Sequence, residues 1–237
     1  MFRFYGLRIL KDYLGHIILI GLPVVMISVN TYLATQNGEP QEVVAWYVAL
    51  VFILMFQVFG GAYAFEGLEH DFYTPFKNRL RAAPVNPVRF ILTHLSYSMI
   101  TGYLQSLVIM LYVVLVYGVS IPNWGLVLLV FLIAVIFAQL LGGVLLMLLK
   151  KGNKAQVGIT LYAILGTFAG GMFFPLPDTR LTSFLERYSS PLAWSRTAVN
   201  AFMASDYTEG LQFLGMVGGI TVVAGLLLSH LSRRVII

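Results

Sequence analysis

Long apolar runs separated by short polar segments make up most of the chain. Six of these runs reach the roughly 20 residues with which an α-helix crosses a bilayer. The clearest lie around VVAWYVALVFILMFQVFGGAYAF and WGLVLLVFLIAVIFAQLLGGVLLMLL. The pattern predicts an all-α integral membrane protein, with six transmembrane helices in one domain over residues 1–237. The predicted spans are about 14–35, 44–65, 89–118, 124–149, 156–174 and 211–231.

The composition agrees with a membrane location. Hydrophobic residues make up 59% of the chain and charged residues 11%, with a mean hydropathy of +0.84. A soluble domain carries roughly 25% charged residues. The chain has no cysteine, which excludes disulfides, thiol catalysis and cysteine metal sites. The first apolar run follows basic residues, as in a signal peptide. No small-residue cleavage site closes it, so we expect it to be retained as the first span.

The basic residues predict how the spans are oriented. With the N-terminus inside, twelve of the fifteen Lys and Arg residues fall in inner segments, whereas Arg180, Arg187 and Arg196 fall outside. Basic loops mark the cytoplasmic side of a membrane protein. We therefore expect both termini in the cytoplasm, and the chain in the plasma or inner membrane of a prokaryote. The net charge of +5 follows from this topology, and no binding to nucleic acid is expected.

Two segments outside the spans are predicted to lie at the membrane surface. The connection at about 175–210 carries apolar residues near helical spacing, which indicates one or two short helices in, or dipping into, the outer interface. Tyr188 and Trp194 are its expected anchors. An ordinary interfacial cap without a part in transport is the alternative. Residues 2–13 form a moderately amphipathic pattern, which predicts an interfacial helix on the inner side.

A short basic helix is predicted in the segment PFKNRLRAAPVNPVRF, between the second and third spans. Thr74 is suited to cap a helix, Pro75 to its first position, and Pro84 ends it. The resulting helix of about nine residues is roughly 13 Å long. It is too short to span the bilayer, so it is expected to lie across the cytoplasmic end of the bundle.

The side chains of this short helix allow two interpretations. Phe76 and Leu80 share one face at a spacing of four, and Lys77 and Arg81 share a neighbouring face. Two apolar side chains framed by positive charge are suited to dock into a groove on a partner protein. The alternative is a loop helix held against anionic lipid.

The spans carry few groups that could support chemistry. None of them has an acid or base near its centre, as an ion-coupled transporter or a membrane enzyme would need. EGLEHD at 66–71 has the residue types of a metal or acid–base site, but it lies where the second span leaves the membrane, so we expect a solvated polar turn there. KKGNKAQ lacks the spacing and the Ser or Thr of a phosphate-binding loop, so any ATP must bind another chain.

Polar and small residues within the spans are candidates for a pathway or for packing. A polar group in a span lines a passage or bonds to a neighbouring helix, and close-spaced small residues let two helices approach. The weak candidates for a substrate pathway are Asn30, Gln57, Thr160 and Thr167. The candidates for helix packing or a dimer contact are Ala163, Gly166 and Gly170.

The order of several motifs resembles the permease subunits of the ABC-2 family of ATP-driven transporters. Glu66 and Glu69 mark an acidic exit from the second span, a short helix follows, and LRAAPV at 80–85 matches the family's L-x-x-x-P-V passage. GGMFFPLPD at 170–178 then ends the fifth span, and SPLAW follows at 190–194. The resemblance covers essentially the full length. It departs at DFYTPF, where the family usually has Gly-Thr, and no substrate-specifying motif is recognisable.

This resemblance implies an assembly and assigns parts of the chain to it. Two permease chains, a second copy or a related one, are expected to pair above two ATPase subunits that bind ATP and Mg. Residues 2–13 match the family's N-terminal helix, 72–83 its coupling helix, and 175–206 its re-entrant outer cap. This chain is then not an enzyme and binds no cofactor or metal. Its expected contacts with the ATPase are Tyr73, Phe76, Lys77, Arg79, Leu80, Arg81, Arg3 and Arg8.

The leading hypothesis is an exporter of an apolar or amphipathic substrate, such as a drug, a peptide antibiotic or a lipid-like molecule. Spans without charge suit such a substrate, and resistance to drugs or antimicrobials would be the biological context. An exporter of polysaccharide or glycolipid from the same family is the main alternative. A stand-alone secondary transporter would need intramembrane charges or inverted repeats, neither of which is evident. A membrane-embedded enzyme would need a cluster of reactive groups.

Overall fold

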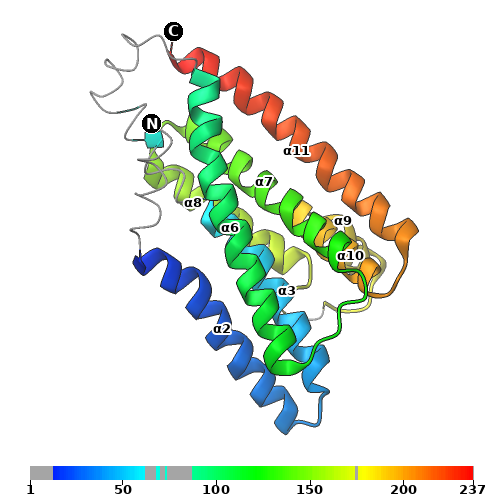
Figure 1. The fold of residues 1–237 in the computed structure, drawn as a ribbon. Coiled ribbons are helices and arrows are strands. Elements are labelled where there is room, and N and C mark those ends of the chain that lie inside the picture. The colour runs from blue at the N-terminus through cyan, green and yellow to red at the C-terminus, as the bar shows by residue number, and fades with distance from the viewer. Residues whose placement is uncertain (1–12, 62–67, 70–72, 74–86, 174–175, 237) are drawn as a thin grey trace.

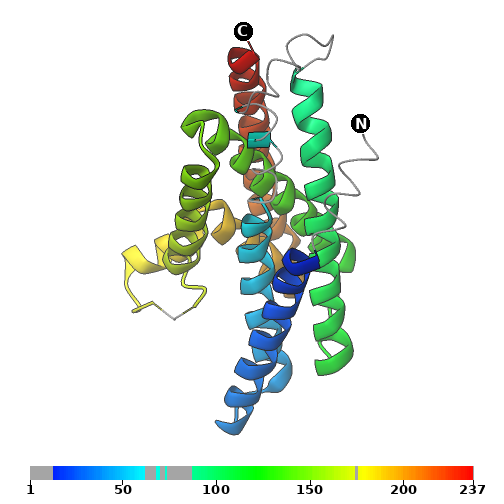
Figure 2. The ribbon, with the colours of Figure 1, turned by 90° about the vertical axis from the view of Figure 1, so that its left-hand side faces the viewer.

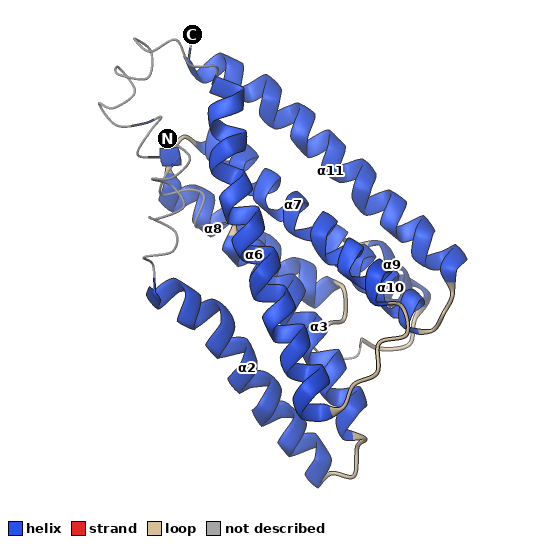
Figure 3. Ribbon diagram, in the orientation of Figure 1, coloured by secondary structure: helices blue, strands red, loops and turns tan. Residues whose placement is uncertain are grey.

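Helices form nearly all of the described part of the protein. The computed structural model describes residues 13–61, 68, 69, 73, 87–173 and 176–236. No strand occurs in these ranges, as Figures 1 and 3 show. The helices are α2 (Tyr13–Gln36), α3 (Gln41–Gly60), α6 (Pro87–Tyr117), α7 (Trp124–Leu149), α8 (Gly152–Ala169), α9 (Arg180–Tyr188), α10 (Pro191–Met203) and α11 (Tyr207–Ile236).

Five of these helices are long and apolar enough to cross a membrane, which agrees with a multi-pass membrane protein. They contain the windows Ile17–Gln36, Gln41–Gly60, Arg89–Tyr117, Trp124–Leu149 and Tyr207–Arg233. The predicted span at 156–174 corresponds to α8, which has 18 residues and starts four residues earlier, at Gly152. α8 is not one of the five helices that are long and apolar enough to cross a membrane. The total of six spans therefore stays a prediction.

The second predicted span, α3, lies at the centre of the bundle. It contacts α2, α6, α7, α8 and α10, and 72% of its apolar window is buried. A helix that is apolar all round is expected to be buried all round. In α2 only 22% of the window is buried, and α2 lies at the side of the bundle in Figures 1 and 2. α7 is the other mostly buried helix, and it packs against α11, α10, α8, α3 and α6.

The two ends of the bundle differ in charge and shape. At one end of the bundle, α6 and α8 begin and α7 and α11 end. We call it the basic end because exposed basic residues collect there. These residues are Arg89, Lys150, Lys151, Lys154 and Arg233. The opposite end, called the cap end, carries α9 and α10. At the basic end, Lys150 adopts a left-handed conformation (φ 56°), which ends α7 and lets α8 begin two residues later.

Truncating a side chain at the centre of α3 should destabilise the bundle. Leu54 is fully buried, so Leu54→Ala leaves a cavity; comparable changes in soluble proteins cost about 2–5 kcal/mol. Leu33 on α2 is 57% exposed and serves as the matched control, because Leu33→Ala removes no packing contact in the core. Thermal unfolding of both variants in detergent checks this prediction. Equal melting temperatures would contradict a central role for α3.

Candidate functional site

At the basic end, Glu69 caps the first turn of α8. Its Oε1 accepts a hydrogen bond of 2.7 Å from the backbone N–H of Gly152, the first residue of that helix. Lys151 stands at the N-cap position and makes no side-chain capping bond. A carboxylate from a distant segment thus satisfies a free N–H and interacts favourably with the positive end of the helix dipole.

Gly152 is required by this arrangement for steric reasons. A Cβ built at this position would overlap the Glu69 carboxylate, because the carboxylate lies directly against the backbone. Sequence analysis placed Glu69 in a possible metal or acid–base cluster; the structure instead shows it bonded to a helix end. Within the described residues, no group of three or more His, Cys, Asp or Glu side chains is arranged to hold a metal.

Of the residues expected to contact an ATPase, the structure describes Tyr73. Its hydroxyl donates to Met147 Sδ of α7 over 3.7 Å, and its ring is half-buried against the bundle. Burial raises the pKa of the Tyr73 phenol above its usual value. This side chain therefore packs on its own chain. Most of the two predicted helices, 2–13 and 72–83, lies outside the described residues. The other expected ATPase contacts also lie outside them: Phe76, Lys77, Arg79, Leu80, Arg81, Arg3 and Arg8.

At the cap end, two short helices occupy the segment where sequence analysis predicted one or two. Thr179 begins α9 with a reciprocal capping box with Thr182, and Ser190 begins α10 by accepting from the N–H of Ala193. Pro191 follows at the first position of α10, where its missing N–H costs no bond. α10 packs deep against α7 and α11, whereas α9 has no buried residue. The depth of these helices in a bilayer stays a prediction.

A cluster of hydrogen bonds connects this cap to the central helix. The Tyr47 hydroxyl of α3 donates to the Gly171 carbonyl over 2.9 Å, and Arg196 Nη1 of α10 donates to the same oxygen over 3.3 Å. Arg196 Nη2 reaches the Glu186 carbonyl at 3.5 Å, while Glu186 Oε1 accepts from the N–H of Leu176 at 3.3 Å. We call Tyr47, Gly171, Glu186 and Arg196 the cap cluster.

Aromatic residues and one ion pair connect α9 to α11. Arg187 forms a salt bridge with Glu209, and its guanidinium lies 5.4 Å from the ring centroid of Phe213. The ring centroids of Tyr188 and Phe213 lie 5.5 Å apart, with the ring planes tilted by 35°. Trp194 Nε1 donates to the Tyr188 carbonyl over 3.1 Å, so the two predicted interfacial anchors are bonded to each other.

The small residues of α8 pack inside the chain. Ala163 is fully buried, and a Cβ built at Gly166 would lie 3.0 Å from Leu192 and 3.4 Å from Ser190 Oγ, both at the start of α10. A Cβ at Gly170 would lie 3.5 Å from the Cβ of Ala193. This face of α8 thus lets α10 approach closely within one chain. No partner chain is needed to cover it.

The four residues named for a substrate pathway are not brought together. Asn30 Nδ2 donates to the Met26 carbonyl on its own helix, α2, and Thr167 Oγ1 bonds to carbonyls of its own helix, α8. Thr160 also lies on α8, and it is partly exposed. Gln57 points into the bundle from α3, where its Nε2 donates to Ser106 Oγ at 2.9 Å and to the Phe131 carbonyl at 3.2 Å.

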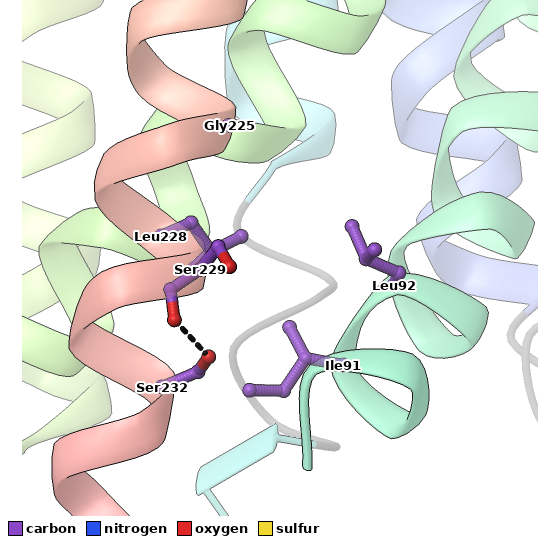
Figure 4. A pocket seen from close by; sticks show the side chains of 6 residues that line it. All are labelled: Ile91, Leu92, Gly225, Leu228, Ser229 and Ser232. Carbon is purple, nitrogen blue, oxygen red and sulfur yellow. Dashed lines mark hydrogen bonds between the residues drawn. The ribbon is translucent and has the colours of Figure 1, made fainter. Parts of the chain in front are cut away.

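Two small cavities lie between helices. The first, of about 10 Å³, is lined by Ile53, Phe56, Gln57, Gln105, Ser106 and Ile109 of α3 and α6. The second, of about 20 Å³, lies between α6 and α11 near the basic end. Figure 4 shows Ile91 and Leu92 of α6 facing Leu228, Ser229 and Ser232 of α11 across it. The Ser232 hydroxyl donates to the Ser229 carbonyl over 2.9 Å, so its proton is used in a hydrogen bond within α11.

These features define a class: a multi-pass helical membrane protein with a basic end, a helical cap and an uncharged interior. A family model described as ABC-2 family transporter protein matches residues 15–228. The match covers most of the chain, so the chain belongs to this family, as its motifs predicted. Members are membrane transport subunits that associate with a separate ABC ATPase. No curated protein and no solved structure gave a match to the chain.

Adding a methyl group at the start of α8 should displace its cap. Gly152→Ala puts a Cβ where the Glu69 carboxylate lies, and loss of a cap costs about 1 kcal/mol of helix stability. Amide hydrogen exchange should therefore accelerate in the first turn of α8. Gly158→Ala is the control on the same helix, because its Cβ would meet only Leu145 and Leu149, at 3.7 Å or more. Equal exchange in the two variants would refute the role of Glu69.

The cap cluster predicts a second glycine effect. Gly171 has φ 60°, and a Cβ at this position would overlap the Glu186 side chain. Gly171→Ala should therefore destabilise the fold both by backbone strain and by this steric clash. Gly118 has φ 71° with open space around it, so Gly118→Ala carries the strain alone. Gly171→Ala should therefore lower the melting temperature more than Gly118→Ala. A smaller or equal effect at Gly171 would mean that Glu186 does not hold this turn.

Proposed function

We propose that this chain is the membrane-spanning permease of an ATP-driven exporter whose substrate is apolar or amphipathic. Membership of the ABC-2 transporter family is the observation that carries the proposal. ATP and Mg bind to the separate ATPase subunits, and the hydrolysis of ATP there drives the export. A drug, a peptide antibiotic or a lipid-like molecule fits this substrate class.

The interior of the described helices supports an apolar substrate over a glycan. No Asp, Glu, Lys or Arg occurs in 43–60, 90–117, 124–149, 155–169 or 210–229. The amide of Gln57 and the hydroxyl of Thr167 are turned into the chain, so neither is presented to a molecule outside it. A polar glycan would need hydrogen-bonding side chains along its route, because it leaves water on entering the membrane.

The small cavities support a pathway that lies between two chains. Pockets for drug-sized ligands measure about 300–1,000 Å³. The two cavities described above measure about 10 and 20 Å³, enough for one or two water molecules. A surface completed by a second permease, identical or related, would provide the space that these two cavities lack.

The charges at the ends support an orientation with the basic end in the cytoplasm. The basic end carries five exposed Lys and Arg residues, which is typical of the cytoplasmic side. At the cap end, Arg187 is neutralised by Glu209 and Arg196 is bonded into the cap cluster. In a prokaryotic plasma or inner membrane, the ATPases would then dock at the basic end and the cap would face outward.

The contact between Glu69 and α8 supports a route for motion from the ATPase. Glu69 lies three residues before the segment 72–83 that resembles the coupling helix, and its carboxylate holds the start of α8. Movement of that segment would therefore act on α8 through one charged hydrogen bond. α8 in turn packs against α10 of the cap, at Gly166 and Gly170.

Truncating the apolar side chains of the coupling segment tests the proposal. Phe76→Ala or Leu80→Ala should abolish most recruitment of the ATPase, since removing a buried anchor commonly costs about 2 kcal/mol or more. Lys77→Ala should have little effect, because a rim charge contributes less and is screened by salt. ATPase co-purification, at equal permease expression, is the measurement. If Phe76→Ala and Leu80→Ala both retain the ATPase like wild type, the segment is a lipid-facing loop and its coupling role is wrong.

A further inference from the structure

The cavity between α3 and α6 has the size and chemistry of an internal water site. Its volume of about 10 Å³ is close to the smallest space that holds one water molecule, about 10–15 Å³. Polar side chains from both helices line it, namely Gln57, Gln105 and Ser106. All three are at least nine-tenths buried. On α6 the site lies near the middle of the helix, at Gln105 and Ser106.

Gln57 presents an unpartnered oxygen at this cavity. Its Nε2 uses both N–H groups, one to Ser106 Oγ and one to the Phe131 carbonyl, so the orientation of the amide is fixed. Rotating the amide by half a turn would place its oxygen against the Phe131 carbonyl oxygen and lose these bonds. Gln57 Oε1 is buried, and no group in the described part of the chain donates a hydrogen bond to it. A water molecule would supply such a donor.

A second buried amide, Gln139 of α7, lies near Gly102, which lines the cavity. Gln139 is fully buried, and neither its Nε2 nor its Oε1 has a hydrogen-bond partner among the described residues. Its Nε2 lies between two glycines, 4.0 Å from a Cβ built at Gly102 of α6 and 3.7 Å from one built at Gly60 of α3. The absence of side chains at these glycines makes room for a polar group. Unpaired amides are costly in an environment that excludes bulk water.

We propose that the junction of α3, α6 and α7 binds a single internal water molecule, which donates a hydrogen bond to Gln57 Oε1. Water fits better than other occupants. A divalent cation is usually held by one or more carboxylates, and the cavity is lined by neutral side chains. A transported substrate would exceed the volume many times over. The proposal rests on the two buried amides and the cavity, so it is independent of the proposed function.

X-ray radiolysis of the purified chain in detergent tests the site directly, because bound water yields hydroxyl radicals that oxidise the side chains around it. Phe56 and Ile109 line the cavity and are 7% and 1% exposed. Phe137 and Ile159 are matched controls, at 5% and 0% exposed, that do not line it. We expect oxidation of Phe56 and Ile109 to be several-fold faster than that of the controls. Equal rates in each pair would overturn the proposal.

A variant connects the water to the amide oxygen. Gln57→Leu removes the acceptor and keeps a side chain of similar volume without adding a sulfur that would consume radicals, so oxidation of Ile109 should fall to the rate of Ile159. Gln212→Leu, at an exposed position on α11, should leave it unchanged. Selective oxidation that survives Gln57→Leu would show that Gln57 does not hold the water. Should that variant fail to fold, brief mixing of the wild-type chain with ¹⁸O-water before exposure decides the matter. A hydroxyl radical adds directly to an aromatic ring, so the oxygen gained by Phe56 comes from water. A slowly exchanging site incorporates ¹⁶O at Phe56, whereas entry from bulk solvent incorporates ¹⁸O and contradicts an internal site.

Discussion

The packing of α3 against five neighbouring helices is the interaction on which the other features depend. Lipid is as apolar as leucine, so helices in a bilayer associate through close packing and hydrogen bonds. α3 provides both, and its buried face continues from Ala45 to Gly60 with little interruption. It also carries Tyr47 of the cap cluster near its start and Gln57 of the buried amide junction near its end. A shift of α3 would therefore disturb the cap and the junction together.

α8 is the helix most dependent on contacts made by other segments. It is the shortest of the long helices, with 18 residues, and its first residue has no capping partner of its own. Glu69 holds its start, and the turn that follows its end is held by Tyr47 and Arg196 at the Gly171 carbonyl. Between these points α10 lies against Gly166. One hydrogen bond thus holds the start of α8 and two hold the turn after its end, so a change at either point would act on the helix.

Much of this arrangement could be predicted from local patterns. Apolar runs identified the long helices within a few residues, and the apolar spacing around Phe184 and Trp194 indicated the helices of the cap. Contacts between distant segments could not be predicted in this way. Glu69 and Gly152 are 83 residues apart, and the apolar pattern placed the start of this helix at about 156, so it did not indicate that Gly152 begins α8 or that Glu69 caps it. Likewise, the spacing of Ala163, Gly166 and Gly170 indicated close approach but not that α10 would be the neighbour.

The direction in which polar side chains point bears on where a substrate travels. A polar residue in a span is ambiguous in a sequence, because helix contact and pathway lining require the same side chains. The buried polar side chains point toward neighbouring helices of the same chain, as Gln57, Ser106 and Gln139 do. The exposed flanks of α2 and α8 carry apolar residues such as Val25, Leu33 and Leu165. The polar groups thus stabilise a single chain. The surfaces left for a second permease or a substrate are apolar, and this supports a route along the outside of each bundle and an apolar or amphipathic substrate.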